Sequence, residues 1–509
     1  MARIVPALLM SVASGTVEKL QSLRWFGSKS KTIETFELLD YGEVQSGADE
    51  FLLLFLRLSY AQGGTDDYFV PLSISGQRRS PSAPLSFSVE HEGSSLWFED
   101  ALYSSSFLKF ASSLLFSNSA LKMQKGTIKG ESTSLMASSP RAQEVSVITT
   151  EQSNTSVVLD GSSIYKSYRK IEPGENPDYE IPSRLAFSSG FRNVPGPLGR
   201  LEYRDDRRYT IGSLSQFVEN EGDCWTYCTR SLGAFLANAG TGKTDLDDES
   251  HGPSCLGLVR KLGKLTSSLH NALASLKADG EFTPVAVTSQ DKSKWADDYC
   301  SLVADTLALV RRKFTGMDPG IARLAGELSN SEKELLGAAG IVRRLESGRM
   351  HKIRIHGDYH LGQVLKAGDE LYIIDFEGEP MRSLGYRRSR HCALRDVSGM
   401  LRSLDYAISF AERKIGSGGP DGGFGVRWRS MASSAFLESY WSAYSPVIQY
   451  LPESFEGMVG LVRFFTLEKA VYELRYEMNN RPSWVDIPMR AIRLLVAEPG
   501  EQKLNNDFN

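Results

Sequence analysis

Two stretches, His356-Gly-Asp-Tyr-His-Leu-Gly-Gln363 and Ile373-Ile-Asp-Phe-Glu-Gly-Glu-Pro380, decide how this 509-residue chain is read. The apolar run Leu-Tyr-Ile-Ile leads directly into Asp375, as expected of a short buried strand. Around both stretches the pattern is that of a short strand pair, whereas most of the chain after Asn220 has helical periodicity. We therefore read the two stretches as polar loops on one strand pair inside a helical domain.

The polar residues of these loops suit transfer of a phosphoryl group from ATP. Such a transfer needs an acidic group that accepts the hydroxyl proton and ligands that hold Mg²⁺ against the phosphates. Protein kinases use His-Arg-Asp with an Asn five residues after the Asp, and here His356, Asp358 and Gln363 have that spacing. Asp375 and Glu377 follow as hard oxygen ligands. The sequence predicts Asp358 as the base and Gln363, Asp375 and Glu377 as metal ligands.

The alternative is that His-Gly-Asp forms a structural turn and that Asp375 to Glu379 form an acidic surface loop. A strand that ends in Asp-x-Glu-Gly-Glu concentrates negative charge, and a bound metal ion would relieve that repulsion. The catalytic interpretation is therefore favoured. His360 adjoins the loop and is expected to support its backbone.

A nucleotide also needs a cation for its α- and β-phosphates. Lys166 lies in the third strand of a predicted five-stranded antiparallel sheet, and Glu180 in the following helix is its expected partner. Asp160-Gly161 predicts the hairpin before that strand, since both residue types tolerate positive φ. Lys170 is the alternative cation, and a solvated strand lysine is the structural alternative. Further predicted nucleotide contacts, some in the turn before the second strand, are Ser153, Thr155, Gln216 and Val218.

The stretch Ala237-Asn-Ala-Gly-Thr-Gly-Lys-Thr244 resembles a phosphate-binding loop. A true loop of this kind follows a buried strand and opens a helix, whose N-terminus binds the phosphate. This one follows a helical pattern and precedes an acidic, loop-forming stretch. It is expected to be a surface turn, and Lys243 is not expected to bind nucleotide.

Composition indicates a globular protein and excludes little else. Hydrophobic residues make up 41% of the chain and the formal net charge is −4, which argues against broad attraction to nucleic acid or to anionic membranes. Five cysteines suit reduced thiols in the cytoplasm, which is the expected location. The N-terminal apolar run is short and interrupted by Pro6, so an amphipathic helix is favoured over a signal sequence.

The chain is expected to have an α+β architecture with three parts. Residues 1–140 have short strand-like runs with Ser- and Gly-rich breaks and form a predicted β-rich cap. Residues 141–220 carry the small antiparallel sheet and one helix. Residues 221–509 are mainly helical and contain the catalytic loops and the expected acceptor site.

These features resemble the maltokinases of the aminoglycoside-phosphotransferase-like kinase superfamily. The resemblance rests on HGDYHLGQVL, IIDFEGEP, LRDVSGMLRSLDYA, EQSNTSVVLDGSSIYKSYRKIEPGENPDYE, LEKAVYELRYEMNNRPSWVDIP and LRWFGSKSK, which together run from Arg24 to Pro488. It implies a bilobal protein-kinase-like fold with an extra N-terminal cap. It also implies Mg²⁺-dependent transfer of the ATP γ-phosphate to maltose, giving maltose 1-phosphate for α-glucan synthesis, with a possible functional link to a trehalose-processing enzyme.

The acceptor site is expected on the last long helical segment. Aromatic rings interspersed with charged groups suit a sugar, which has an apolar face and a hydroxylated rim. The alternative is that Tyr472 and Tyr476 are core residues and that Lys469 and Glu473 form an exposed pair one helical turn apart. Candidate acceptor-binding residues are His356, Lys469, Tyr472, Glu473, Tyr476 and Trp484.

Two other functions stay open. The catalytic loops specify phosphoryl transfer rather than the acceptor, so another sugar kinase, such as a glucosamine kinase, is the alternative enzyme. A nucleotide-binding pseudokinase is a third possibility, because Gln363 replaces the usual Asn and no glycine-rich loop is present. Gln keeps the carbonyl oxygen that Mg²⁺ needs, which disfavours this last interpretation.

Overall fold

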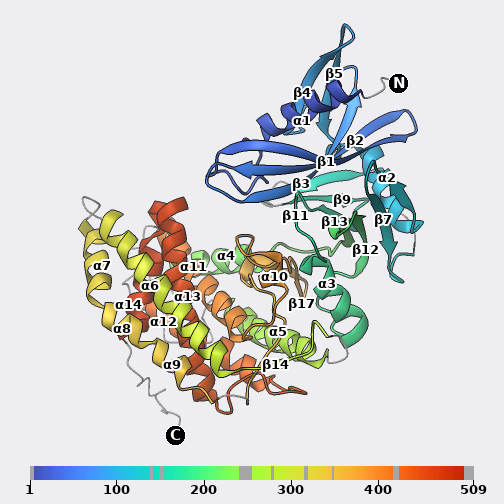
Figure 1. Ribbon diagram of the computed structural model, residues 1–509. Helices are drawn as coiled ribbons and strands as arrows, with labels where there is room; N and C mark the ends of the chain where they lie inside the picture. The colour runs from blue at the N-terminus through green and yellow to red at the C-terminus, as the bar shows by residue number, and fades with distance from the viewer. Residues whose placement is uncertain are drawn as a thin grey trace. The chain divides into compact units, whose positions relative to one another are not determined.

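The computed structural model describes residues 5–137, 142–148, 154–239, 255–276, 280–313, 319–346, 349–415 and 423–497. Ser153 and residues 240–244 of the phosphate-loop-like stretch lie outside these ranges. The chain divides into two compact units. The first comprises Met1–Ala186, Val194–Glu219 and Pro380–Tyr386, and the second Phe187–Asn193, Asn220–Glu379 and Arg387–Asn509. Figure 1 shows the sheets of the first unit in blue to green and the helices of the second mostly in yellow to red.

The first unit contains two antiparallel sheets. One has the order β1-β2-β3-β5-β4, with β11 also paired to β3, and the other has the order β6-β7-β12-β13-β10-β9-β8. The strands are β1 (Ile33–Ser46), β2 (Asp49–Tyr60), β3 (Thr65–Ser75), β4 (Ser86–His91), β5 (Ser94–Asp100), β6 (Ala120–Lys122), β7 (Thr127–Ser132), β8 (Val145–Ile148), β9 (Thr155–Leu159), β10 (Ser163–Ser167), β11 (Lys170–Ile171), β12 (Pro197–Arg204) and β13 (Arg208–Gln216). Its helices are α1 (Pro6–Leu20), α2 (Ser105–Phe116) and α3 (Pro177–Arg184).

Strand β2 is buried on both faces, which explains its nearly continuous apolar sequence. Phe51, Leu53 and Phe55 point into the core shared with the seven-stranded sheet, whereas the alternating residues Leu52 and Leu54 pack in the core that includes α1. This follows from the two-residue period of side chains along a strand. The side chains of β2 thus connect the two cores.

The cap and the small-sheet lobe, expected as separate parts divided at residue 140, belong to one compact unit. Strand β7 from the expected cap pairs with β12, and the rings of Phe55 and Tyr203 lie 3.9 Å apart between the two sheets. The five predicted strands thus form part of a seven-stranded sheet. One of the boundaries between the two units falls at Glu219, and the three-part division stays a prediction.

The second unit is mainly helical and carries the predicted strand pair, β16 (Val364–Ala367) with β17 (Glu370–Ile373). Helix α11 packs against α4 and α13. The other elements of this unit are β14 (Val285–Ala286) and β15 (His351–Lys352). The helices are α4 (Cys224–Ala239), α5 (Cys255–Ser275), α6 (Ser289–Lys313), α7 (Pro319–Asn330), α8 (Glu332–Gly337), α9 (Ala339–Arg343), α11 (Leu394–Ile415), α12 (Gly423–Ser442), α13 (Phe455–Asn480) and α14 (Asp486–Ala497). The short helix α10 (Leu384–Arg387) begins in the segment assigned to the first unit.

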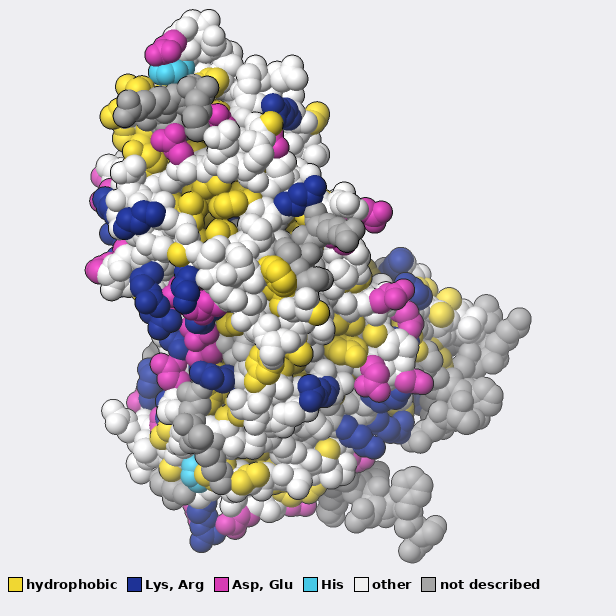
Figure 2. Space-filling model, turned by 90° about the vertical axis from the view of Figure 1, so that its right-hand side faces the viewer, with side chains coloured by type: hydrophobic (Ala, Val, Ile, Leu, Met, Phe, Trp, Pro, Cys, Tyr) yellow, Lys and Arg dark blue, Asp and Glu magenta, His cyan; other side chains and the backbone are white. Residues whose placement is uncertain are grey.

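The surface carries both signs of charge. Lys and Arg side chains are interspersed with Asp and Glu on the face drawn in Figure 2. None of the helices within the described residues is long and apolar enough to cross a membrane. All five cysteines are free thiols, and only Cys300 is partly exposed.

One buried hydroxyl in the second unit offers a test of its packing. Thr306 of α6 is 1% exposed and its Oγ1 has no hydrogen-bond partner. The residues around it are apolar and come from five helices: Val303, Leu307, Leu328, Leu335, Val471, Leu474 and Ile492.

We expect Thr306→Val to raise the free energy of unfolding by about 1 kcal/mol, because the change keeps the side-chain shape and removes an unsatisfied polar group. Urea unfolding of the full chain measures the effect. The same substitution at Thr226, which is exposed on α4, is the matched control and is expected to give no gain. A loss of stability in Thr306→Val would show that the hydroxyl is satisfied.

Candidate active site

The His356-Gly-Asp loop is anchored by a buried carboxylate on α11. Asp396 Oδ2 accepts a hydrogen bond of 2.8 Å from the backbone N–H of His356, and Oδ1 accepts one of 2.9 Å from Gly357. Asp396 is 2% exposed, and His270 of α5 places Nε2 3.2 Å from Oδ2. Burial raises the pKa of the Asp396 carboxyl, but His270, His356 and the Gly357 N–H outweigh it and hold that pKa below its ordinary value.

His356 connects the two loops. Its Nε2 donates to the backbone oxygen of Ile374 at 2.9 Å, and its ring lies 4.7 Å from that of Phe376. The backbones also approach closely, since a Cβ on Gly357 would lie 3.5 Å from Cα of Gly378. Both glycines have positive φ, which favours residues without a side chain. The expected adjacency of the loops is therefore confirmed, and His356, a predicted acceptor contact, is 1% exposed and bonded to backbone.

Gln363 and Asp375 lie together at the edge of the strand pair. Gln363 Nε2 donates to Asp375 Oδ2 at 2.9 Å, and the Ile374 N–H donates to the Gln363 backbone oxygen at 3.0 Å. Asp375 has a φ of 61°, an uncommon conformation for a residue with a side chain. Such strain is concentrated at functional sites.

The donor types at this position fit Mg²⁺. Mg²⁺ prefers carboxylate and amide oxygens and usually keeps several waters, so one carboxylate and one amide suffice when phosphates complete the shell. Among the described residues no three His, Cys, Asp or Glu side chains converge on one point. Gln363 and Asp375 are in contact, and the backbone oxygen of Glu377 accepts a hydrogen bond from Arg387 Nη1 at 3.0 Å.

Asp358, the predicted base, faces a lysine from α13, the helix predicted to contact the acceptor. Lys469 Nζ lies 4.0 Å from Asp358 Oδ1 and 2.6 Å from Glu379 Oε1. Burial lowers the pKa of the Lys469 ammonium, but the carboxylates of Glu379, Asp358 and Glu473 outweigh it and raise that pKa above its ordinary value. Lys469 is therefore protonated at neutral pH. The side chain of Asp358 is 31% exposed and can be reached by a ligand.

The other predicted acceptor contacts lie on or near α13 in different environments. Glu473 does not form the exposed pair with Lys469 that was the structural alternative, because Arg402 Nε of α11 binds its carboxylate at 2.7 Å. Burial raises the pKa of Glu473 above its ordinary value. The Tyr472 ring lies 5.3 Å from Lys469 Nζ, and Tyr476 is 44% exposed.

Trp484 belongs to an aromatic cluster just beyond α13. Its ring is nearly parallel to those of Tyr406 and Phe410, with both centroids 6.1 Å away. The guanidinium groups of Arg413 and Arg481 each lie 5.3 Å from its ring centroid. Trp484 is thus a half-buried ring held by side chains from α11 and from the end of α13.

In the first unit Lys166 has a charged partner that was not predicted from the sequence. Its Nζ lies 3.0 Å from Asp178 Oδ2, and Tyr168 donates to the same oxygen at 3.1 Å. Glu180, the expected partner, is buried on the same helix α3. Thr155 Oγ1 accepts from buried Arg169 at 3.0 Å. The two candidates at the end of the sheet, Gln216 and Val218, are exposed and half-buried respectively.

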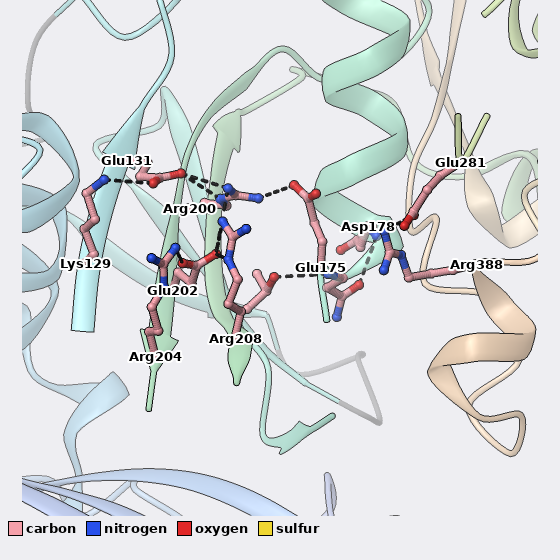
Figure 3. Close-up of polar contacts among 12 residues, drawn as sticks. Lys129, Glu131, Glu175, Asp178, Arg200, Glu202, Arg204, Arg208, Glu281 and Arg388 are labelled. Carbon is pink, nitrogen blue, oxygen red and sulfur yellow. Dashed lines mark hydrogen bonds and ion pairs between the residues drawn. The ribbon is translucent and has the colours of Figure 1, made fainter. Parts of the chain in front are cut away.

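A polar network fixes the segment before α3 to the seven-stranded sheet (Figure 3). Arg200 of β12 binds Glu131 of β7 at 2.8 Å and pairs with Glu175, which precedes α3. Arg204 and Arg208 both bind Glu202. The network holds the start of α3, and with it Asp178, against the sheet that carries Lys166.

Four residues that contribute contacts to the candidate site were not predicted from the sequence: Asp178, Glu379, Asp396 and His270, which is a partner of Asp396. His270 of α5 is buried, with Nδ1 2.8 Å from the Tyr440 hydroxyl. Asp178 could have been chosen from the sequence. It is acidic, lies in the first turn of α3 beside Glu180, and is no farther from Lys166 along the chain than Glu180 is. Asp396 and Glu379 are identified only by their contacts.

Comparisons with known proteins agree with this architecture. Glucosamine kinase of Mycolicibacterium smegmatis is 24% identical over 394 residues, which cover 74% of this chain and 86% of that protein. Glucosamine kinase of Streptacidiphilus jiangxiensis is 24% identical over 359 residues, covering 69% of this chain and 73% of that protein. No protein-family model matches the chain.

The same fold occurs in solved structures. Glucosamine kinase in complex with glucosamine, ADP and inorganic phosphate aligns with a TM-score of 0.62 and 18% identity over 94% of this chain and 98% of that one. A second crystal form of glucosamine kinase gives a TM-score of 0.63 at 18% identity, over 94% and 99% of the two chains. The expected α+β, bilobal kinase-like fold is therefore confirmed.

The role of Asp396 can be tested through the pH dependence of stability. We expect Asp396→Asn to lower the free energy of unfolding at pH 7 by about 2 kcal/mol, because a buried carboxylate that accepts backbone hydrogen bonds is lost. The folded-state pKa of Asp396 is depressed, so its contribution is complete above about pH 4 and is lost as the pH falls through the folded-state value.

The difference in the free energy of unfolding between wild type and Asp396→Asn should therefore become smaller as the pH is lowered. Urea unfolding at several pH values measures it. Asp369→Asn, at a fully exposed carboxylate, is the control and should change stability little at any pH. A difference that does not depend on pH would contradict the ionised role of Asp396.

Proposed function

We propose that this chain is an ATP-dependent kinase that phosphorylates an amino sugar, with glucosamine as the preferred acceptor. The observation that carries the proposal is that the loop of Asp358, which Asp396 holds, adjoins the strand end where Gln363 and Asp375 are in contact, with His356 hydrogen-bonded to Ile374 between them. The proposal is supported by a fold shared with glucosamine kinases and by relatives of that name that cover most of the chain.

In the proposed reaction Asp358 orients an acceptor hydroxyl and takes its proton as the hydroxyl oxygen bonds to the γ-phosphorus. The bond from that phosphorus to the bridging oxygen breaks, and ADP leaves. Gln363 and Asp375, with Glu377 as a further candidate, are the proposed ligands of Mg²⁺, which would neutralise phosphate charge when bound. Lys166 is proposed to bind nucleotide phosphates.

The choice of acceptor rests on charge as well as on relatives. Three carboxylates accompany the predicted acceptor residues: Glu379 pairs with Lys469 and Glu473 with Arg402, whereas Asp358, 4.0 Å from Lys469 and 31% exposed, is the carboxylate that we propose meets the acceptor. Carboxylates suit the ammonium group of an amino sugar, whereas maltose is neutral. The relatives also favour glucosamine over the maltose that the sequence suggested. Lys469, Tyr472, Glu473, Tyr476 and Trp484 remain the proposed acceptor contacts.

A panel of acceptors tests the substrate. We expect Mg²⁺-dependent ADP formation with glucosamine at a kcat/KM about tenfold or more above that for glucose or maltose, because only glucosamine offers an ion pair to the carboxylates. An aminoglycoside is the fourth acceptor. Asp358→Asn should lose about 10²- to 10⁴-fold in kcat with little change in ATP affinity.

Two outcomes of this panel would overturn the assignment. Turnover of maltose without glucosamine would restore the maltose kinase reading. Binding of ATP without turnover of any acceptor would favour a nucleotide-binding pseudokinase.

The assignment of Lys166, in β10, has a matched control in the next strand, β11. We expect Lys166→Met to raise the KM for ATP and to lower kcat/KM at least about 100-fold, because a buried cation that pairs with phosphate is removed. Lys170→Met is the control, since Lys170 is 41% exposed and pairs with Asp66 at 2.7 Å. Steady-state kinetics with varied ATP measures both variants. Equal losses would reject Lys166 as the specific phosphate ligand.

A further inference from the structure

Lys469 has two carboxylates within reach, and they come from the two catalytic loops. Its Nζ is in direct contact with Glu379 at 2.6 Å and stands 4.0 Å from Asp358. The third carboxylate near it, Glu473 on its own helix, is bound by Arg402 at 2.7 Å. The position of the ammonium group is therefore set mainly by competition between Glu379 and Asp358.

This competition matters for a base. An aspartate in direct contact with an ammonium has one oxygen occupied and is stabilised as the anion, so it accepts a hydroxyl proton less readily. The side chain of lysine is long and flexible, and Nζ needs to move only about 1 Å to reach hydrogen-bond distance from Asp358. The contact with Glu379 holds it away.

We propose that Glu379 is a positioning residue that keeps Lys469 off Asp358 and so leaves the base available to the acceptor hydroxyl. This inference rests on the proposed function, in which Asp358 is the base. Glu379 also ties the second catalytic loop to α13, the helix of the proposed acceptor contacts. Losing its charge releases Lys469 onto Asp358.

Kinetics of single and double variants test the inference. Glu379→Gln should lower kcat about 10- to 100-fold with the KM for ATP nearly unchanged, while Glu379→Asp should retain most of the activity. Lys469→Met should mainly raise the KM for the acceptor. The double variant Glu379→Gln/Lys469→Met should have a higher kcat than Glu379→Gln alone, because the released cation is gone.

A double variant no faster than Glu379→Gln would overturn the inference, since it would mean that Glu379 acts independently of Lys469. Glu438→Gln, at an exposed position on α12, is the control for loss of one surface charge and should match wild type. Wild type that phosphorylates none of the acceptors would instead reject the proposed function.

A second experiment tests the inference through protein stability and does not depend on enzyme activity. Urea midpoints are compared for Asp358→Asn, Lys469→Met and the pair, first in wild type and then in a Glu379→Gln background. We expect the coupling between positions 358 and 469 to be small in wild type and clearly larger when Glu379 is neutral, because the ion pair with Asp358 then forms. Equal coupling in both backgrounds would overturn the inference.

Discussion

The loop that bears Asp358 depends on the carboxylate of Asp396. A loop cannot leave its backbone N–H groups unpaired in a buried place, and here two successive N–H groups, of His356 and Gly357, both point at one carboxylate. His356 is thereby fixed so that its imidazole reaches the backbone of Ile374. The loop that bears Asp358 and the strand end that bears Asp375 are then held in one arrangement by buried groups, and the exposed part of Asp358 faces outward.

A second constraint is that the charged groups of the candidate site are partnered. Lys166 pairs with Asp178, and Arg402 pairs with Glu473. Lys469 lies near both Glu379 and Asp358. Buried or half-buried charges are costly without such partners. The partners also set where each charge can go. Lys469 of α13 contacts Glu379 and is a cation beside Asp358, and we propose that without this contact it would move onto Asp358.

Part of this arrangement was predictable because it is encoded by neighbours in sequence. The Asp160-Gly161 turn was predicted from residue types that tolerate positive φ, and these residues have φ values of 50° and 62°. The strand pair around the catalytic loops was predicted from its apolar runs and is present as β16 and β17. The union of the cap with the small sheet in one unit could not be predicted, because the pairing of β7 with β12 joins segments that are far apart in the chain.

By itself the sequence indicated the kinase-like fold, through its resemblance to a kinase superfamily. It also indicated the two polar loops and the candidates Asp358, Gln363 and Asp375, because their spacing along short strands and turns is set by local backbone geometry. Only the tertiary structure decided which charges meet. Asp396 reaches the loop from α11, Glu379 rather than Glu473 holds Lys469, and Asp178 contacts Lys166. Electrostatic partners are chosen by distance in space and by burial, and neither quantity can be read from spacing in the chain.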